Sequence, residues 1–461
     1  MRSEHSALNP PTNPPTPSSP PTPPRPQSIA VQNDKINRDN CYIDLDRLKS
    51  YGYESSVLYS RWDINVERSK KFDKFSDRLK VPIPKFDPVE IGDAGRKPLE
   101  HCAPATTVVA PLQHSVDASH ITFGVATSID RLQDSMEAFS HWASGTKARI
   151  FALVEPGPEV KEIRQQAIEL DIDLTIIESD QEVLDRYISL TRVLLENRKS
   201  NSKWGVIMDD DTFYPSMYHL VKRLATYDAS VPQYVGALTE DVMGLSNYGY
   251  MAYGGAGIFL SMPLLEEMDR HHDECAKLTE FGDKRISQCI YLHTTTKLTW
   301  DRSLHQLDFW QSDGSGFFES GRELPLSLHH WKSTDWFPVD LVGMSKVSSV
   351  CGDECQLKRW RIGDSDNWFL VNGFSVIQHS HPVKDTVSME QTWDPSPWAR
   401  EEGWAYSLGP LRPKDEGKVA LRLRDAYVDR QGSLRQIYIY DPEDGQPPYV
   451  LEAVWKVTKG A

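Results

Sequence analysis

The feature that most constrains the fold is a short apolar segment that ends in three acidic residues. Trp204–Met208 reads WGVIM and is followed directly by Asp209, Asp210 and Asp211. This pattern predicts a buried strand that delivers carboxylates to one edge of a sheet. Because side chains alternate along a strand, we expect Asp209 and Asp211 on one side and Asp210 on the other. Oxygen ligands of this kind favour Mg²⁺ or Mn²⁺ over Zn²⁺, and a solvated turn is the alternative interpretation.

The residues before this strand alternate regularly between predicted strands and helices. The strands are Ile121–Thr127, Arg149–Val154 and Leu174–Glu178, and the helices are Asp130–Ala143, Pro158–Leu170 and Gln181–Arg198. Such alternation predicts a parallel-type sheet covered on both faces, with ligands bound beyond the carboxyl ends of the strands. The first turn lacks the glycines of a dinucleotide-binding loop, and the chain has no phosphate-binding P-loop.

A glycine-rich segment and two further helices follow the acidic residues. After a predicted helix at Ser216–Tyr227 and a strand at Gln233–Leu238, Tyr253–Leu260 reads YGGAGIFL. Gly254, Gly255 and Gly257 allow the backbone to approach a neighbouring group closely. A helix is expected from Pro263, and another from Asp283 to about Leu292. Since Asp283 follows a glycine, its default role is to cap that helix.

Composition limits the class of protein. The chain has 461 residues and a net charge of −15, which argues against a broad nucleic-acid or anionic-membrane surface. No stretch has the apolar length of a membrane helix, and the first thirty residues lack a signal-peptide core, so we expect a soluble chain without a visible secretory address.

The six cysteines favour an oxidising compartment. Cys275 and Cys289 flank a predicted helix start, Cys351 and Cys355 are four positions apart, and Cys41 and Cys102 remain. An even number in close pairs is typical of disulfides, and six reduced thiols are the alternative interpretation. A zinc site is disfavoured because no second Cys/His pair lies at the usual spacing near the Cys351 pair.

The chain is expected to divide into four parts. Residues 1–30 are predicted to be disordered, because ten of the seventeen residues from Pro10 to Pro26 are proline. Residues 31–119 are predicted to form an N-terminal extension packed on the main domain. Residues 120–335 are predicted to form the α/β domain, and residues 340–461 a small β-rich module. Its predicted strands are Asn367–Gln378, Val419–Val428, Leu434–Tyr440 and Tyr449–Val457.

The ordered set of motifs resembles the Fringe-like inverting glycosyltransferases of family 31, especially their fungal branch. The matching segments lie at about residues 120–333 and read VIMDDDTFYP, YVGALTED, YGGAGIFLS, GDKRISQCI, LHQLD and LPLSLHHW. The resemblance implies a GT-A fold, which is a Rossmann-like α/β core that binds nucleotide sugars. It also implies a UDP-sugar donor, a Mn²⁺ ion and a β1,3 linkage formed in the Golgi or elsewhere in the secretory pathway.

The resemblance also assigns roles to individual residues. Asp211 and His329 would bind the metal, and Asp209 or Asp210 would lie towards the ribose or the waters on the metal. His330 is an equally acceptable ligand by composition, but the first histidine of the pair matches the family pattern. Residues Gly254, Gly255 and Gly257 would shape the floor between donor and acceptor.

Inversion requires a base at the acceptor hydroxyl, on the face of the sugar opposite the leaving group. Asp283 matches the family's catalytic acidic segment and is the implied base. The segment here is Gly-Asp rather than the paired acids common in animal members, and Glu280 lies nearby. Relatives usually begin with a transmembrane anchor, whereas this chain begins with the proline-rich segment.

The expected function is therefore metal-dependent, inverting transfer of a hexose or N-acetylhexosamine from a UDP-sugar to a glycan or glycoprotein hydroxyl. A catalytically inactive sugar or nucleotide binder on the same fold is the main alternative. A haloacid-dehalogenase phosphatase also places acids after an apolar strand, but it needs Asp-x-Asp-x-Thr/Val, and Phe213 follows at the required position. Neither the transferred sugar nor the acceptor can be inferred from these motifs, since small differences in pocket shape decide them.

Overall fold

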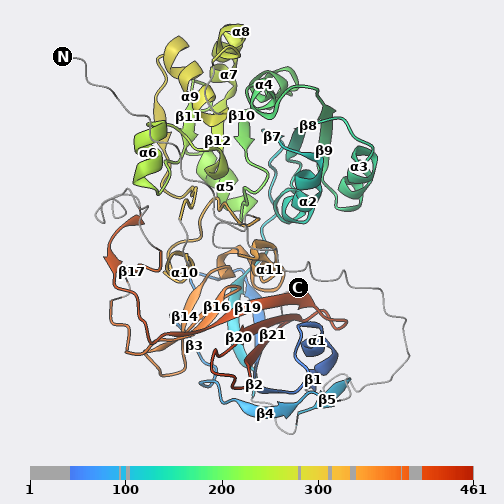
Figure 1. Cartoon of the computed structure of the whole chain (residues 1–461), viewed down its shortest axis with the longest axis vertical. Coiled ribbons are helices and arrows are strands. Elements are labelled where there is room, and N and C mark those ends of the chain that lie inside the picture. The colour runs from blue at the N-terminus through green and yellow to red at the C-terminus, as the bar shows by residue number, and fades with distance from the viewer. Residues whose placement is uncertain are drawn as a thin grey trace, which may run out of the picture. The chain divides into compact units, whose positions relative to one another are not determined.

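Two β-sheets organise the chain in the computed structural model (Figure 1). It describes residues 42–92, 95–99, 104–278, 282–309, 314–332, 339–385, 387–393 and 408–459. The segment predicted to be disordered, residues 1–30, lies outside these ranges, as do Glu280, Cys41 and Cys102.

The first sheet has seven strands in the order β13-β11-β12-β10-β7-β8-β9. Their bounds are β7 Ile121–Ala126, β8 Arg149–Val154, β9 Asp173–Glu178, β10 Trp204–Met208, β11 Tyr234–Gly236, β12 Ile258–Ser261 and β13 Leu298–Trp300. The strand β10 has the bounds predicted from the apolar run before the acidic residues, and it lies inside the sheet between β7 and β12.

The sheet is mixed rather than wholly parallel. Strands β9, β8, β7 and β10 are parallel, but β12 pairs antiparallel with both β10 and β11. The reason lies in where the strands begin and end. The strand β12 begins directly after the glycine-rich segment, which packs against the residues at the end of β10. It therefore runs away from the edge at which β10 stops.

Helices cover both faces of this sheet, as the alternating pattern predicted. On one face α2 (Ile129–Ala143), α3 (Val160–Glu169) and α5 (Met217–Leu224) share a hydrophobic core with β7, β8 and β10. On the other face α4 (Val183–Glu196), α7 (Met262–Asp269) and α9 (Gly282–His293) form a second core. Alternate residues of one strand enter different cores: Val206 packs in the first and Ile207 in the second.

Short helical segments connect these elements to the rest of the chain. They are α6 Val242–Tyr248, η1 Gly254–Ala256, α8 His272–Cys275, α10 Ser315–Phe318, α11 Leu341–Ser345, α12 Ser348–Cys351 and η2 Asp353–Cys355. Disulfides join Cys275 to Cys289 and Cys351 to Cys355, which are the two close pairs singled out from the sequence.

The second sheet combines strands from both ends of the chain. Nine of its ten strands follow the order β3-β14-β15-β16-β19-β20-β21-β2-β4, and β6 also pairs with β2. Their bounds are β2 Ser56–Ser69, β3 Arg78–Leu79, β4 Asp87–Glu90, β6 Thr106–Pro111, β14 Arg359–Ile362, β15 Trp368–Val371, β16 Ser375–Gln378, β19 Val419–Val428, β20 Leu434–Tyr440 and β21 Tyr449–Lys459.

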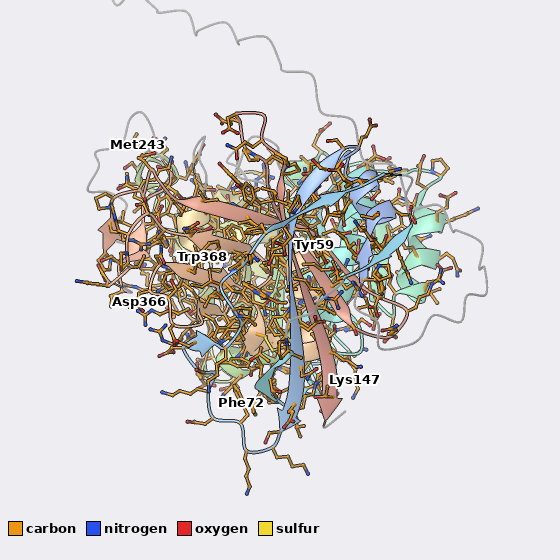
Figure 2. The ribbon with its side chains drawn as sticks, turned by 90° about the horizontal axis from the view of Figure 1, so that it is seen from below. Tyr59, Phe72, Lys147, Met243, Asp366 and Trp368 are labelled. Carbon is orange, nitrogen blue, oxygen red and sulfur yellow. A yellow bond between two sulfur atoms is a disulfide. The ribbon has the colours of Figure 1, made fainter. Side chains whose placement is uncertain are left out.

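The longest contact in this sheet joins distant parts of the sequence. Strand β2 runs parallel to β21 from the pair Leu58 and Tyr449 onwards, and Figure 2 shows the two strands side by side, with Tyr59 labelled on β2. Strands of the predicted N-terminal extension and of the predicted C-terminal module thus share one sheet. The division of the chain into domains at the predicted boundaries stays a prediction.

One predicted strand of this sheet is a hairpin. Asn367–Gln378 was expected to be continuous, but the chain reverses between β15 and β16. Gly373 adopts a φ of 80°, a conformation that glycine allows at little cost, and a Cβ there would lie 2.5 Å from the Met344 carbonyl oxygen.

The remaining elements are two small sheets and one helix. Strand β1 (Tyr42–Asp44) pairs with β5 (Arg96–Pro98), β17 (Met389–Glu390) pairs with β18 (Leu411–Arg412), and α1 spans Leu45–Ser50. No helix among the described residues combines the length and apolar character needed to cross a bilayer.

Candidate functional site

The acidic residues after β10 separate into two directions, as strand alternation predicted. Asp211 Oδ1 lies 3.0 Å from His329 Nε2, and Asp209 Oδ2 lies 3.5 Å from the same nitrogen. Asp210 faces the opposite way, where its carboxylate accepts hydrogen bonds from Arg131, including one of 2.7 Å from Nε, and from the Thr127 hydroxyl. The structure therefore brings Asp209 and Asp211 to His329 and directs Asp210 elsewhere.

A backbone pairing places the histidines beside the acidic residues. Phe213 and Leu328 each donate a backbone N–H to the other's carbonyl oxygen at 2.8 Å. The pairing joins two segments that are far apart in the sequence, one following β10 and one preceding His329. Phe213 is also buried in a hydrophobic cluster with Met344 of α11 and Phe374 of the turn between β15 and β16, so these residues anchor the segment that carries the acids.

Hydrogen bonds orient His329 towards the carboxylates. Its Nδ1 lies 3.0 Å from the carbonyl oxygen of Gln306, which can only accept, so Nδ1 carries the proton of this bond. The other ring nitrogen, Nε2, faces Asp211 and Asp209. A neutral imidazole held in this way presents a lone pair at Nε2, which is the form that ligates a metal.

His330 occupies a different environment beside His329. Its backbone has a positive φ of 63°, and its Nε2 lies 2.8 Å from Asp308 Oδ1. Asp308 in turn accepts a hydrogen bond from the Thr239 hydroxyl. Asp211, His329 and His330 each offer a ligand atom within 4.8 Å of the others, so both histidines lie within reach of one cation.

The charges of these groups are strongly coupled. Burial raises the pKa of Asp209 to about 7, and the neighbouring Asp211 and Asp283 add to this shift. Burial opposes the charged forms of Asp211 and His329, but each stabilises the other. Their mutual attraction lowers the pKa of Asp211 well below its usual range and raises the pKa of His329 to about 9. The site concentrates negative charge that a cation would neutralise.

The glycine-rich segment packs directly against the site. A Cβ on Gly255 would lie 2.3 Å from atoms of the His329 ring, and one on Gly254 would lie 2.7 Å from Asp209 Oδ1. Gly257 has a φ of 92°, and a Cβ there would meet the Tyr214 hydroxyl at 2.9 Å. At all three positions a side chain would displace a neighbouring group, so close approach of the backbone explains the glycines.

Side chains from three other segments hold this loop in place. The Thr212 hydroxyl donates to the Gly255 carbonyl at 3.1 Å, and the Ser327 hydroxyl donates to the Ala256 carbonyl at 2.8 Å. Gln306 Oε1 accepts the Ala256 N–H at 3.0 Å. Gln306 thus binds both the loop and His329, through its side chain and its backbone respectively.

Asp283 lies on the other side of Gly254. Helix α9 begins one residue before it, so Asp283 lies in the first turn rather than at the expected cap. Its Oδ2 accepts the Gly254 N–H at 3.3 Å and its Oδ1 accepts the Lys284 N–H at 2.7 Å. Burial raises the pKa of Asp283 despite these hydrogen bonds. A half-buried carboxylate with a raised pKa is suited to accept a proton.

Two residues of the site had no signal in the sequence. Tyr187, on α4, places its hydroxyl 3.4 Å from Asp209 Oδ1, and a Cβ on Gly254 would meet that hydroxyl at 2.3 Å. Arg131, on α2, holds Asp210. Both lie on predicted helices, where a tyrosine or an arginine is ordinary. Only the spatial packing of those helices against the end of β10 identifies them.

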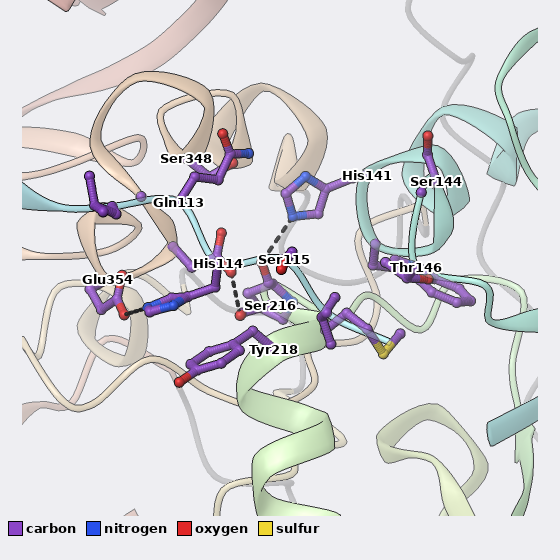
Figure 3. A pocket seen from close by; sticks show the side chains of 18 residues that line it. Gln113, His114, Ser115, His141, Ser144, Thr146, Ser216, Tyr218, Ser348 and Glu354 are labelled. Carbon is purple, nitrogen blue, oxygen red and sulfur yellow. Dashed lines mark hydrogen bonds and ion pairs between the residues drawn. The ribbon is translucent and has the colours of Figure 1, made fainter. Parts of the chain in front are cut away.

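A cavity of about 220 Å³ lies outside this cluster (Figure 3). His114, His141, Tyr218 and Glu354 are among its lining residues, and the rings of His114 and Tyr218 stack at 3.9 Å. None of the site residues predicted from the sequence lines it.

Comparison with known proteins gives one family match and several partial structural similarities. A family model described as "Protein of unknown function, DUF604" matches residues 245–350, a segment that includes Gly254, Asp283 and His329. No curated protein matches the chain.

The solved structures that resemble the chain include glycosyltransferases of several kinds. The apo-form glycosyltransferase GlyE of Streptococcus pneumoniae TIGR4 has 14% identity and a TM-score of 0.28, over 38% of this chain and 44% of that one. The mannosyltransferase PcManGT of Pyrobaculum calidifontis, solved with GDP-Man and Mn²⁺, has 15% identity and a TM-score of 0.28, over 40% and 55% respectively. TarS of S. aureus has 10% identity and a TM-score of 0.28, over 39% and 35%.

The chain thus spans about half or less of the length of these structures. Its own topology has a mixed α/β sheet with helices on both faces and carboxylates at the end of the central strand β10. This confirms the α/β class expected from the sequence, while the finer GT-A assignment stays a prediction, and the strands of the second sheet confirm the expected β-rich part.

Proposed function

We propose that the protein is a Fringe-like glycosyltransferase of family 31 that uses a metal ion and inverts the anomeric centre. It would transfer a hexose or N-acetylhexosamine from a UDP-sugar to a hydroxyl of a glycan or glycoprotein, forming a β1,3 linkage. The observation that supports this proposal most strongly is the placement of Asp209 and Asp283 against Gly254, and of His329, paired with Asp211, against Gly255.

The donor side of the proposed site consists of Asp211, His329 and Asp209. Their carboxylate and imidazole donors suit Mn²⁺, which an imidazole ligand favours over Mg²⁺. A bound divalent cation would neutralise the negative charge that develops on the departing diphosphate. Of the two acids proposed to lie towards the ribose or the metal waters, Asp209 faces His329, as Asp211 does, and is therefore the better placed. Asp210 would act by positioning, since its carboxylate already holds Arg131 and Thr127.

The acceptor side of the proposed site centres on Asp283. Its carboxylate would take the proton from the acceptor hydroxyl as that oxygen forms a bond to the anomeric carbon of the sugar. The bond from this carbon to the diphosphate oxygen breaks at the same time, and UDP leaves with the electron pair. The Gly254 N–H, which donates to Asp283, would fix the direction of the base. Gly255 and Gly257 would keep the floor between the two sides free of side chains.

The proposed reaction takes place in the Golgi lumen or elsewhere in the secretory pathway. The two disulfides support this location, because disulfides persist in oxidising compartments and are rare in reducing ones. The domain that carries the activity is proposed to span residues 120–335.

The test is release of UDP from a panel of UDP-sugars, with Mn²⁺ or with a chelator. We expect Mn²⁺-dependent release from one donor, and its loss in Asp211→Ala. Asp364→Ala is the matched control, because it removes the same group from an exposed turn far from β10 in the sequence and should leave the release unchanged.

Two other outcomes decide between the alternatives. Mn²⁺-dependent UDP binding without turnover, even when candidate glycan acceptors are supplied, would favour a non-catalytic sugar or nucleotide binder on the same fold. If UDP does not bind in the presence or absence of Mn²⁺, the proposed function is wrong.

A further inference from the structure

A second group of metal-binding side chains lies where α8 meets α9. His271 and Glu274 come from the α8 segment, and His293 is the last residue of α9. Their ligand atoms all lie within 4.8 Å of one another. None of the three belongs to the site proposed above.

The disulfide Cys275–Cys289 explains why these residues meet. His271 precedes Cys275 by four positions, and His293 follows Cys289 by four positions. Residues four apart lie on the same face of a helix. When the two cysteines are bonded and the segments run in opposite directions, the two histidines lie opposite each other one turn away. The crosslink thus sets the spacing of the histidines independently of any bound ion.

The contacts within the group match this arrangement. The rings of His271 and His293 stack with their centroids 4.3 Å apart and their planes 13° apart. Glu274 approaches a nitrogen of each ring, with Oε1 3.7 Å from His271 Nδ1 and Oε2 3.8 Å from His293 Nε2. These separations are too long for hydrogen bonds. The three side chains lie close together, but Glu274 is not hydrogen-bonded to either of these ring nitrogens.

One ring nitrogen of this group has no hydrogen-bond partner among the described residues. His271 Nδ1 is buried from solvent and has no hydrogen-bond partner among the described residues. A buried polar atom without a partner costs free energy, and a ligand that binds it removes that cost. A cation bound among the two imidazoles and the carboxylate would give His271 Nδ1 its missing partner, once the rings turn out of their stack so that both in-plane lone pairs point to the ion.

We propose that His271, Glu274 and His293 bind a divalent transition-metal ion of the zinc class. Two imidazole nitrogens and one carboxylate oxygen are a donor set that Zn²⁺ uses, with water completing the coordination shell. The imidazoles disfavour Mg²⁺ and Ca²⁺. The site differs in this respect from Asp209, Asp211 and His329, where carboxylates contribute more of the donors. The ion would add a second link between α8 and α9, next to the disulfide.

The test measures Zn²⁺ binding to the full chain by equilibrium dialysis, without reference to any activity. Asp211→Ala serves as the background, because it removes a ligand of the other proposed site. This variant should bind one equivalent of Zn²⁺ at micromolar concentration. Adding His293→Asn or Glu274→Gln should remove that equivalent. Both residues are at least partly exposed, so the folded structure should survive the changes.

A spectroscopic measurement identifies the ligands. Cu²⁺ bound to the Asp211→Ala protein should give an electron paramagnetic resonance spectrum with coupling to two imidazole nitrogens, reduced to one in His293→Asn. The control is His381→Asn, which changes an exposed histidine elsewhere and should alter neither measurement. Absence of Zn²⁺ binding in the Asp211→Ala protein, or equal binding after His293→Asn, would overturn the proposal.

Discussion

Replacement of Gly255 by alanine should disable the proposed metal site with little change elsewhere. The added Cβ would lie 2.3–2.4 Å from three atoms of the His329 ring, so the ring must move by about 1 Å to reach ordinary contact. The ring has little room to move, since its Nδ1 is hydrogen-bonded to the Gln306 carbonyl oxygen and its Nε2 faces Asp211. Metal–nitrogen distances tolerate only about 0.2 Å. Loss of an outer-shell contact weakens metal binding about 10–100-fold, and displacement of a ligand should cost at least as much.

The assay is titration with Mn²⁺, with the free ion followed by electron paramagnetic resonance and stability followed by denaturant unfolding. The control is Gly205→Ala on β10, where the added Cβ would meet Leu265 Cδ1 at 2.7 Å in the hydrophobic core. Both variants overpack the interior and should lose about 1–3 kcal/mol of unfolding free energy. Only Gly255→Ala should lose Mn²⁺ affinity. The reasoning is refuted if Gly255→Ala binds Mn²⁺ as tightly as the unaltered protein.

Three further predictions concern charge. Mn²⁺ must displace the proton on His329, whose pKa is raised to about 9, so affinity measured by titration at several pH values should rise about tenfold per pH unit between pH ~7 and ~9 and then level off. Below pH ~7 the rise should be steeper, because Asp209, whose pKa is raised to about 7, must also lose a proton. A flat affinity profile would contradict this statement. The same raised pKa means that the folded, metal-free protein holds a proton that the unfolded chain releases near pH ~6.5, so this contribution to stability is lost as pH rises from there through 9. Denaturant unfolding of the metal-free protein at several pH values checks this loss. Arg131→Ala leaves the buried carboxylate of Asp210 with one partner fewer and should lower the unfolding free energy by about 1–3 kcal/mol. The control is Arg164→Ala, which removes a half-exposed ion pair with Glu178 at 3.6 Å and should change the unfolding free energy by less than about 1 kcal/mol.

The parts of the fold that could be predicted are those encoded by local patterns. The bounds of β10 follow from an apolar run that ends abruptly at Asp209, and those of β19 and β20 follow from β-rich runs between turn residues. The opposite directions of Asp209 and Asp210 follow from strand alternation alone. These features need no knowledge of the rest of the molecule.

The parts that could not be predicted depend on contacts between distant residues. No local signal pairs Leu58 with Tyr449, so the sharing of one sheet by the two ends of the chain was not foreseen. The antiparallel direction of β12 depends on where the glycine-rich segment packs. The reversal at Gly373, in contrast, has a local signal, because Asn372-Gly373 between two β-forming runs is typical of a hairpin turn.

The site was predictable to a similar extent. The acids, glycines and histidines carry their own motifs, and the structure places Asp211 beside His329. Tyr187 and Arg131 reach the site only because α4 and α2 pack near the end of β10. A tyrosine or an arginine on a helix has no motif that indicates such a position.

The most direct test of the proposed inverting transfer is to separate donor binding from turnover in Asp283→Asn. The substitution keeps the shape of the side chain and removes its ability to accept a proton. UDP binding with Mn²⁺ should stay within about twofold of the unaltered protein, while transfer of the sugar should fall by about 10²–10⁴-fold, the usual contribution of a general base. Full transfer activity in Asp283→Asn would contradict the assignment of the base and with it the proposed mechanism.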